Sequence, residues 1–290
     1  MKILVTGRHG QLARSLAERG GDEIHLMGRA DLDLAVAGSA RSAILAARPD
    51  LVVNAAAFTA VDLAESEEAA AHRINADGAG EVAGVARELG VPIIHISTDY
   101  VFDGRATAPY GETADTAPIN AYGRTKLAGE GAVRAATPDH LILRTSWLIS
   151  PFGKNFVRNM VDLGQQRETL SVVADQHGNP TSALDLADAI LALAARWSSG
   201  DAVGEGETYH LAGPDAISWA GFAAKVMDQL RALGQPAANV RPIASADWPT
   251  KAPRPTNSTL DTGKYRRDVG AALPSLDASL EHVIRRLVAA

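Results

Sequence analysis

The sequence predicts an α/β fold in which a doubly wound parallel sheet is accompanied by a smaller C-terminal α/β unit. Two observations lead to this prediction. Short, β-rich apolar runs alternate with longer amphipathic segments up to about residue 150, and turn-rich and proline-containing stretches then replace this rhythm. Alternation of strand and helix favours parallel strands joined by crossover helices, and the change of rhythm indicates a second unit.

Five apolar runs are candidate strands because turn or helix-capping residues bound each of them. Runs that are apolar at consecutive positions suit strands buried on both faces. In chain order they are KILVTG (2–7), EIHLMG (23–28), DLVVNAAA (50–57), VPIIHIS (91–97) and HLILRTS (140–146).

The segments between these runs are long enough to be crossover helices. Amphipathic patterns cover residues 39–48, 73–89 and 120–136, and each lies between two candidate strands. Because parallel strands are joined by right-handed crossovers, the chain is expected to build a Rossmann-type sheet with helices on both faces.

The chain beyond about residue 150 has a different character. ISPFGKN and ADQHGNPTS are rich in turn residues, DLADAILALAARW predicts a strong helix, and residues 235–260 contain five prolines. We therefore expect residues 1–149 and 182–212 to form the sheet domain. Residues 150–181 and 213–290 are expected to form the second, smaller domain.

Charge and composition narrow the classes of partner. The 290-residue chain has a formal net charge of -6 and its 28 lysines and arginines are dispersed, so neither nucleic acid nor a membrane surface is an expected partner. It contains no cysteine, which excludes disulfides and thiolate chemistry and fits a reducing compartment. The first apolar run, ILV, is too short for a signal peptide, so the expected location is cytoplasmic.

The first candidate strand leads into a glycine-rich turn. In VTGRHGQLARSLAERG, Gly7, Gly10 and Ala13 follow a Gly-x-x-Gly-x-x-Gly/Ala spacing. Small residues let the backbone approach a pyrophosphate at a helix N-terminus, where free N–H groups and the helix dipole favour an anion. The turn therefore predicts a dinucleotide-binding domain, although a tight strand-to-helix connection would use the same residues. After the second candidate strand, Arg29 favours a cofactor with a 2′-phosphate, which indicates NADPH over NADH.

A tyrosine and a lysine share one face of a predicted helix. In APINAYGRTKLAGE, Tyr122 precedes Lys126 by four residues, so the two side chains can lie close together. The two residues are either solvated polar surface residues without a catalytic role or a proton donor beside a cation. The spacing alone leaves both interpretations open.

A set of motifs spread along the chain is more specific than any one of them. In order they are GRHGQLA, NAAAFTAVDLAE, HISTDYVFDG, NAYGRTKLAGE, LRTSWL, DQHGNPTS and RPTNSTL. With these motifs, essentially the whole chain resembles the dTDP-4-dehydrorhamnose reductases of the extended short-chain dehydrogenase/reductase superfamily. The resemblance implies an oxidoreductase that converts a dTDP-linked 4-keto-6-deoxyhexose to dTDP-L-rhamnose with NADPH or NADH, for polysaccharide biosynthesis. The second domain would then bind the nucleotide sugar.

The resemblance places the family's catalytic threonine, tyrosine and lysine on Thr98, Tyr122 and Lys126. Hydride addition to a ketone creates an alkoxide that must be protonated, and Tyr122 is the expected donor. An unperturbed phenol has a pKa near 10, so cycling near neutrality needs a shift of up to about three units, roughly 4 kcal/mol, toward the phenolate. Lys126 is expected to act in that direction and to reach the nicotinamide ribose, whereas Thr98 would hydrogen-bond the ketone oxygen.

Further positions take cofactor and substrate roles from the resemblance. Besides Tyr122 and Lys126, the expected cofactor contacts are Gly7, Gly10, Gln11, Leu12, Arg29, Asp33, Leu34, Ala57, Phe58 and Thr59. Besides Thr98, the expected substrate contacts are Asp99, Tyr100, Trp147 and Arg254. Four have an ordinary alternative. Asp33 could be a strand-to-helix cap with Leu34 as its hydrophobic neighbour, Trp147 a core aromatic, and Arg254 a solvated loop residue instead of a diphosphate ligand.

No metal is expected, because the eight histidines show no metal-ligand spacing and the reduction requires no ion. Some family members dimerise through carboxylates bridged by Mg²⁺. Ser15 and Leu184 stand at two of the aligned positions and cannot replace carboxylates, so a homodimer of another kind stays open.

Two other functions are kept beside the reductase. One is a related nucleotide-sugar 4-reductase or epimerase that makes a different 6-deoxysugar, because no residue pattern determines which face of the ketone meets the nicotinamide. The other is a non-catalytic regulatory subunit of the same fold. The intact set of Thr98, Tyr122 and Lys126 argues against the second.

Overall fold

Six parallel strands form the central sheet of the computed structural model, which describes residues 1–289. Their order across the sheet is β2-β1-β3-β4-β5-β10, and every neighbouring pair is parallel. They are β1 (Ile3–Thr6), β2 (Ile24–Met27), β3 (Leu51–Asn54), β4 (Ile93–Thr98), β5 (His140–Thr145) and β10 (Thr208–His210). The apolar runs predict the first five strands, and the predicted fold class is confirmed.

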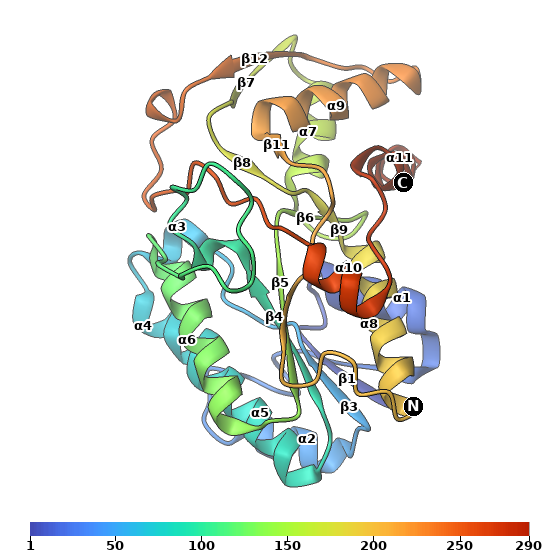
Figure 1. Ribbon diagram of the computed structural model, residues 1–290. Helices are drawn as coiled ribbons and strands as arrows, with labels where there is room; N and C mark the ends of the chain where they lie inside the picture. Colours follow the sequence, from blue (N-terminus) through green and yellow to red (C-terminus); the bar gives the residue numbers. More distant parts are fainter. Residues whose placement is uncertain (290) are drawn as a thin grey trace.

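Helices cover both faces of this sheet (Figure 1). One face packs against α1 (Gln11–Gly20) and α8 (Ala183–Ser198), and the other against α2 (Ser39–Ala47), α5 (Gly78–Leu89) and α6 (Ala121–Ala136). Successive strand residues point to opposite faces. In β1, Ile3 and Val5 accordingly join the α1 and α8 side, whereas Leu4 joins the α2 and α5 side. This two-sided burial explains why the strand runs are continuously apolar.

Short helical segments complete this part of the chain. They are α3 (Val61–Ala64), α4 (Glu68–His72), the π-helical η2 (Arg73–Asp77), and the 3₁₀ segments η1 (Gly21–Glu23) and η3 (Asp99–Val101). The predicted helix over residues 73–89 is therefore η2 followed by α5.

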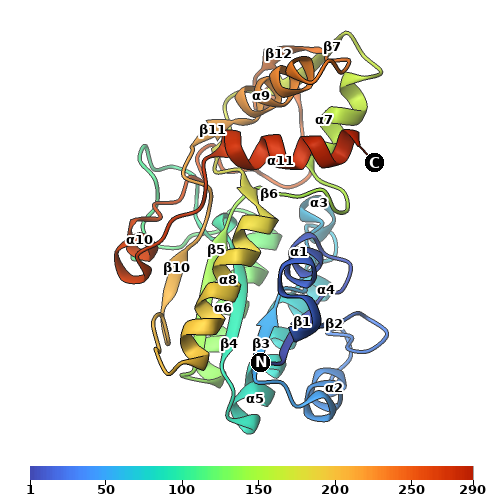
Figure 2. The ribbon, with the colours of Figure 1, turned by 90° about the vertical axis from the view of Figure 1, so that its right-hand side faces the viewer.

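A second hydrophobic core lies beyond the carboxyl ends of the strands (Figure 2). It is built from α7 (Phe156–Gly164), β7 (Thr169–Val173), α9 (Trp219–Ala232), β12 (Asn239–Ile243) and α11 (Leu276–Val288). Short paired strands connect the parts: β6 (Leu148–Ile149) with β9 (Thr181–Ser182), and β8 (His177–Gly178) with β11 (Ile217–Ser218). The 3₁₀ segment η4 (Ser245–Asp247) follows β12, whereas α10 (Gly263–Val269) returns to the sheet, where Tyr265 packs on Tyr209 of β10.

The strand order reverses at β1, because the chain runs from β1 out to β2 and then crosses to β3 on the other side. In open α/β sheets, ligands bind beyond the carboxyl ends of the strands at such a switch point. Gly7 lies there with φ 87°, and a Cβ on it would stand 3.1 Å from the Cα of Ala56 after β3. The glycine is therefore required by both its backbone conformation and the close approach of the two strands.

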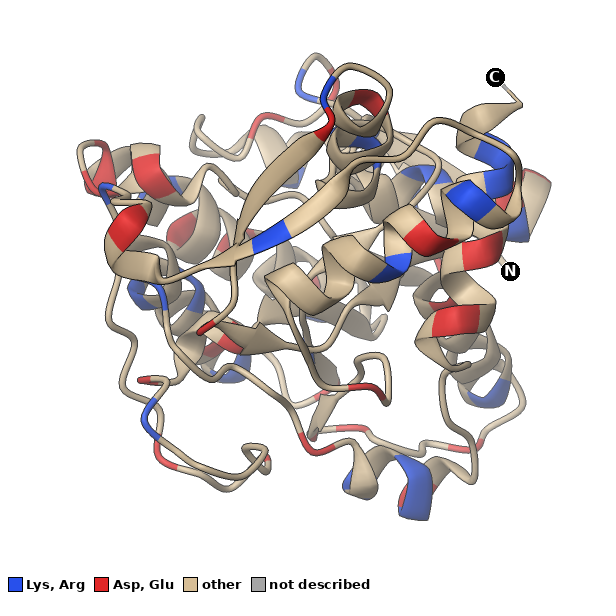
Figure 3. Ribbon diagram, turned by 90° about the horizontal axis from the view of Figure 1, so that it is seen from above, with Lys and Arg blue, Asp and Glu red and all other residues tan. Residues whose placement is uncertain are grey.

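Charged residues of both signs are interspersed along the ribbon when the molecule is seen from above (Figure 3). Among the helices formed by residues 1–289, none combines the length and apolar character needed to cross a bilayer. The cytoplasmic location and the absence of a nucleic-acid partner stay predictions.

Candidate active site

A cavity of about 400 Å³ opens at the carboxyl ends of β1, β3, β4 and β5. Its walls include Thr98, Tyr122 and Lys126 together with Gln11 and Leu12 at the start of α1. The structure thus brings the three predicted catalytic side chains to the glycine turn, although this turn is far from them in the chain. We name this space the catalytic cavity.

A second cavity of about 400 Å³ adjoins the first around the glycine turn. Both are lined by Gly10, Ala57 and Thr59. The second cavity, which we name the outer cavity, is also lined by the remaining predicted cofactor contacts, Gly7, Arg29, Asp33, Leu34 and Phe58. All the predicted cofactor positions therefore lie along these two adjoining cavities.

The start of α1 fits a pyrophosphate. Gly10 is the N-cap and provides no side-chain cap, and its own N–H donates to the carbonyl of Gly7 at 2.8 Å. Among residues 1–289, the N–H groups of Gln11 and Leu12 donate to no other group of the protein. Free N–H groups at a helix start attract an anion, so this part of the site has the donors that a dinucleotide requires.

The first turn of α6 holds Tyr122 against the end of β4. Asn120 caps the helix by accepting from the N–H of Gly123 at 2.8 Å. A Cβ on Gly123 would clash with the carbonyl oxygen of Tyr100, so only glycine lets the helix come this close to the segment after Thr98. The result is that Thr98 and Tyr122 face the same cavity.

Lys126 lies one turn further along α6 and is buried. Its Nζ donates to the carbonyl oxygen of Ile96 at 2.6 Å. Burial lowers the pKa of Lys126 to about 8, and the nearby Glu130 carboxylate acts in the opposite direction.

The protonation of Tyr122 differs from the sequence-based expectation. Burial raises the pKa of its phenol to about 12, outweighing the hydrogen bond with Thr98, which acts to lower it. Shared helical spacing led us to expect Lys126 to favour the phenolate, but the ammonium is directed to Ile96. Tyr122 is therefore protonated near neutrality and ready to act as a proton donor.

Asp99 and Tyr100 follow Thr98 in the chain; Asp99 lines the catalytic cavity, and Tyr100 contacts Tyr122. Asp99 accepts from Oγ1 of Thr98 at 2.9 Å and from Oγ of Ser146 at 3.1 Å. Burial raises the pKa of Asp99 to about 6 against the opposing effect of these hydrogen bonds. The ring of Tyr100 meets that of Tyr122 edge to face, with centroids 6.0 Å apart. Asp99 therefore orients Thr98, and Tyr100 orients Tyr122.

Trp147 combines a packing contact with an unpaired donor. Its ring stacks on Trp219 of α9, with centroids 3.4 Å apart and planes 6° apart, and its backbone has a φ of 43°. A Cβ on Gly178 would clash with the indole, which explains the glycine. The indole lines the catalytic cavity, and its buried Nε1–H has no partner within residues 1–289. Trp147 thus packs against the second core through Trp219, and its indole N–H lies beside Gly178.

A third cavity of about 580 Å³ lies on the other side of this stack, and we name it the distal cavity. Trp219, Tyr100, Trp248 and Arg254 are among its lining residues. The Arg254 side chain is only 16% exposed, and its Nη2 donates to Oδ2 of Asp62 at 2.9 Å. The structure therefore excludes the solvated-loop alternative for Arg254, because its guanidinium is held at a cavity wall.

Comparison with known proteins places this geometry in a family. The family model described as "RmlD substrate binding domain" matches residues 1–289. A dTDP-4-dehydrorhamnose reductase of Sinorhizobium fredii is 42% identical over 290 residues, which cover 99% of this chain and 98% of that protein. The chain belongs to the dTDP-4-dehydrorhamnose reductase family. The predicted family is confirmed.

Two further relatives of the reductase family inform the choice of cofactor and substrate. The crystal structure of a Bacillus anthracis dTDP-4-dehydrorhamnose reductase in complex with NADP superimposes with a TM-score of 0.89 at 34% identity, covering 98% of this chain and 99% of that one. A Streptomyces niveus protein named dTDP-4-keto-6-deoxy-D-glucose reductase is 44% identical over 246 residues, 83% of this chain and 82% of that protein.

The positions associated with the metal-bridged dimers of some reductase family members are buried here. Ser15 donates to the carbonyl of Gln11 at 2.9 Å, and Leu184 is 1% exposed in the core. Within residues 1–289, no group of His, Asp and Glu side chains is arranged to hold a metal ion. Homodimer formation stays a prediction.

Sequence reasoning assigned no role to Trp219 or Ser146 at the reductase site. Trp219 reaches the site through its stack on Trp147, which is distant in the chain, so no local pattern identifies it. Ser146 belongs to the LRTSWL motif, and its place directly before Trp147 is the signal that could have identified it. Asp33 does not cap the helix that follows it, which was its ordinary alternative role. Its Oδ1 accepts from the N–H of Ala35, whereas the N-cap of α2 is Gly38. Asp33 is therefore part of a turn that faces the outer cavity.

Proposed function

We propose that this chain transfers a hydride from NADPH, or NADH, to the 4-keto group of dTDP-4-dehydro-L-rhamnose and so forms dTDP-L-rhamnose for polysaccharide biosynthesis. The observation that carries the proposal is that Thr98, Tyr122 and Lys126 line one cavity with the open helix start after the glycine turn. Membership of the reductase family supports this assignment.

The roles of the side chains follow from their protonation and contacts. When bound, a reduced nicotinamide supplies the hydride. Tyr122 supplies the proton to the sugar oxygen, because burial keeps its phenol protonated. Thr98 donates its proton to Asp99, and turning this hydroxyl toward the ketone oxygen would exchange one hydrogen bond for another. Lys126, which lines the same cavity, would hold the ribose hydroxyls of the bound nicotinamide nucleotide.

The outer cavity supports a preference for NADPH. Arg29 is exposed at its wall and forms no ion pair within residues 1–289, so its charge is available to a 2′-phosphate. Arg8 is less suitable, because its Nη2 pairs with Oδ2 of Asp31 at 2.7 Å. The NADP bound to the Bacillus anthracis relative supports the same choice.

We assign the nucleotide part of the substrate to the distal cavity and to the second core. Aromatic rings of Trp219, Trp248 and Tyr100 line this cavity and suit a nucleobase and sugar, whereas Arg254 suits a diphosphate. Arg254 would have to exchange its contact with Asp62 for the diphosphate. This assignment agrees with the predicted division into a dinucleotide-binding domain and a nucleotide-sugar-binding domain, which stays a prediction.

The test is a coupled assay that supplies dTDP-4-keto-6-deoxyglucose, its 3,5-epimerase and NADPH, with the product identified by NMR. Formation of dTDP-L-rhamnose supports the proposal. Turnover without the epimerase, giving a D-configured 6-deoxysugar, would instead assign the activity carried in the name of the Streptomyces niveus relative. NADPH binding without turnover of either sugar would favour the non-catalytic regulator.

A further inference from the structure

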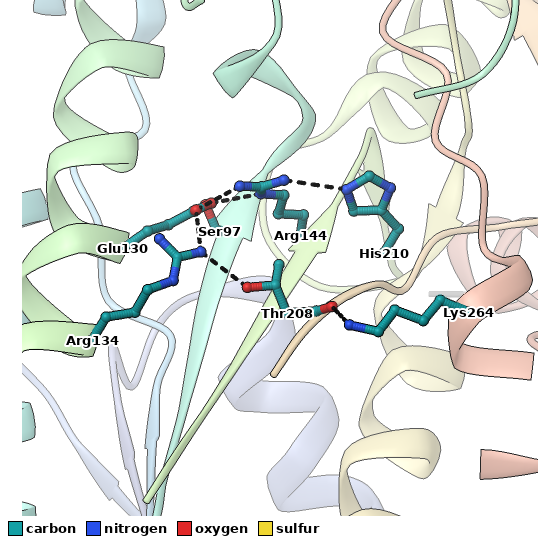
Figure 4. Close-up of polar contacts among 7 residues, drawn as sticks. All are labelled: Ser97, Glu130, Arg134, Arg144, Thr208, His210 and Lys264. Carbon is teal, nitrogen blue, oxygen red and sulfur yellow. Dashed lines mark hydrogen bonds and ion pairs between the residues drawn. The ribbon is translucent and has the colours of Figure 1, made fainter. Parts of the chain in front are cut away.

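A completely buried carboxylate lies behind the catalytic cavity. Glu130 of α6 is 0% exposed and receives a bidentate contact from Arg144 of β5, with Nε to Oε1 and Nη2 to Oε2 both at 2.8 Å. Ser97 Oγ donates to Oε1 at 2.6 Å and Arg134 Nη2 donates to Oε2 at 3.0 Å. Figure 4 shows these groups converging on the carboxylate. Both carboxylate oxygens are therefore saturated with donors.

Glu130 is ionised despite its burial. Burial acts to raise the pKa of Glu130, but the hydrogen bonds and charge of Arg144, with smaller effects from Ser97 and Arg134, hold it below its ordinary value. His210 stands 3.5 Å from Arg144, and burial lowers its pKa to about 4, so it adds no charge near neutrality. Glu130 is consequently a permanently negative group, which the two positively charged guanidinium groups of Arg144 and Arg134 hold between α6 and β5.

The connections of this carboxylate lead to the reacting side chains. Along α6, Tyr122, Lys126 and Glu130 are spaced at four residues and lie on one face of the helix. On β4, Ser97 directly precedes Thr98, and the register pairs Ser97 with Arg144. Glu130 therefore ties the helix that carries Tyr122 and Lys126 to the strand end that carries Thr98.

We propose that Glu130 is a positioning residue for the ketone reduction, which sets the separation between α6 and the end of β4 and places a carboxylate one helical turn from Lys126. This inference rests on the proposed function. It goes beyond that function because Glu130 does not line the catalytic cavity, and it acts through Ser97 and Lys126.

The effect of Glu130 on the protonation of Lys126 follows from the charges of the groups around the lysine. Burial lowers the pKa of Lys126, and Glu130 is the neighbour that opposes this effect. Tyr122 is protonated, and the pKa of His95 is held well below its ordinary value by burial and by Lys126, so neither carries charge near neutrality. Asp99 lines the same cavity, and Arg134 and Arg144 pair with Glu130. A neutral residue 130 would therefore favour the uncharged amine.

The test compares the full chain with its Glu130→Gln variant, which keeps the shape of the side chain and removes the charge. We expect kcat with the keto sugar to fall by about 10- to 100-fold, the scale for misplacing reacting groups. We also expect NMR of isotope-labelled lysines to show the Lys126 ammonium titrating at lower pH. The Lys126→Met protein identifies the signal. Arg124→Gln is the matched control: within residues 1–289, Arg124 on the same helix pairs only with the exposed Glu68, so its loss should change neither readout.

Two further variants distinguish a loss of protein stability from a loss of positioning as the cause of a lower kcat. Glu130→Gln alone leaves the guanidinium of Arg144 buried without its carboxylate partner, which should lower Tm. The double variant Glu130→Gln/Arg144→Gln lacks that buried cation, so its Tm should recover toward the parental value while kcat stays low. Ser97→Ala keeps the ion pair and should lower kcat with little change in Tm, which keeps the inference testable if Glu130→Gln does not fold. Three results would each overturn the inference. They are an unchanged Lys126 titration in folded Glu130→Gln, recovery of kcat together with Tm in the double variant, and a parental kcat in Ser97→Ala. A parental protein without keto-sugar turnover would refute the proposed function instead, and the Lys126 titration would still test Glu130.

Discussion

Replacing Tyr122 with phenylalanine removes the proposed proton donor and keeps its ring. The phenol has a pKa of about 12 in the folded chain, about two units above its ordinary value, which corresponds to about 3 kcal/mol in favour of the protonated form. At neutral pH the Tyr122 phenol is thus fully protonated. We expect Tyr122→Phe to lower kcat by about two to four orders of magnitude, the scale for losing a positioned general acid. NADPH binding and the fold should survive, because the edge-to-face contact with Tyr100 needs only the ring.

The assay follows NADPH absorbance with the keto sugar and measures NADPH affinity separately. Tyr110→Phe is a suitable control, because the Tyr110 hydroxyl donates to Asp103 at 2.6 Å and Tyr110 lines neither the catalytic nor the outer cavity. It should retain the parental kcat. If Tyr122→Phe also reduces the keto sugar at the parental rate, Tyr122 is not the proton donor.

The same protonation states predict the pH dependence of turnover. Tyr122 stays protonated through the ordinary pH range, whereas Lys126 has a pKa of about 8. The lysine is charged below that value and loses its charge above it, so kcat should fall as the pH rises through about 8. The residual activity of Tyr122→Phe should fall over the same range. A parental profile that stays flat up to pH 10 would show that the charge of Lys126 is not required.

Three further substitutions test separate parts of the site. Arg29→Ala should raise the KM for NADPH more than that for NADH, and equal changes would exclude Arg29 from the 2′-phosphate site. Arg254→Ala should weaken dTDP binding by about 1.5 to 3 kcal/mol in calorimetry with NADPH affinity nearly unchanged, because it removes a charge-assisted contact. Unchanged dTDP affinity would give Arg254 a structural role, through its contacts with Asp62 and Ala252. Gly178→Ala should destabilise the protein by about 1 to 3 kcal/mol, because the added methyl group would clash with Trp147, and a parental Tm would contradict that packing.

Local sequence patterns were sufficient for the features that depend on residues close together in the chain. The apolar runs predict five of the six sheet strands because strands buried on both faces are apolar throughout. The glycine turn marks the switch point because only small residues permit the close approach of Gly7 to Ala56. Four-residue spacing places Tyr122 and Lys126 on one helix face because α-helical geometry determines that relation alone. The longer motifs identified the family because each of them is also a run of residues close together in the chain.

Tertiary structure decided what depends on segments distant in sequence and on burial. The stack of Trp147 on Trp219 and the pairing of Arg254 with Asp62 join residues separated by much of the chain, so no local spacing encodes them. The pKa of Tyr122 rises instead of falling, because desolvation is set by everything that surrounds a group and exceeds the effect expected from one neighbour on the same helix. The sequence by itself therefore determined the fold class and the family and predicted that Thr98, Tyr122 and Lys126 act together, whereas only the assembled structure determined the contacts and protonation of these side chains.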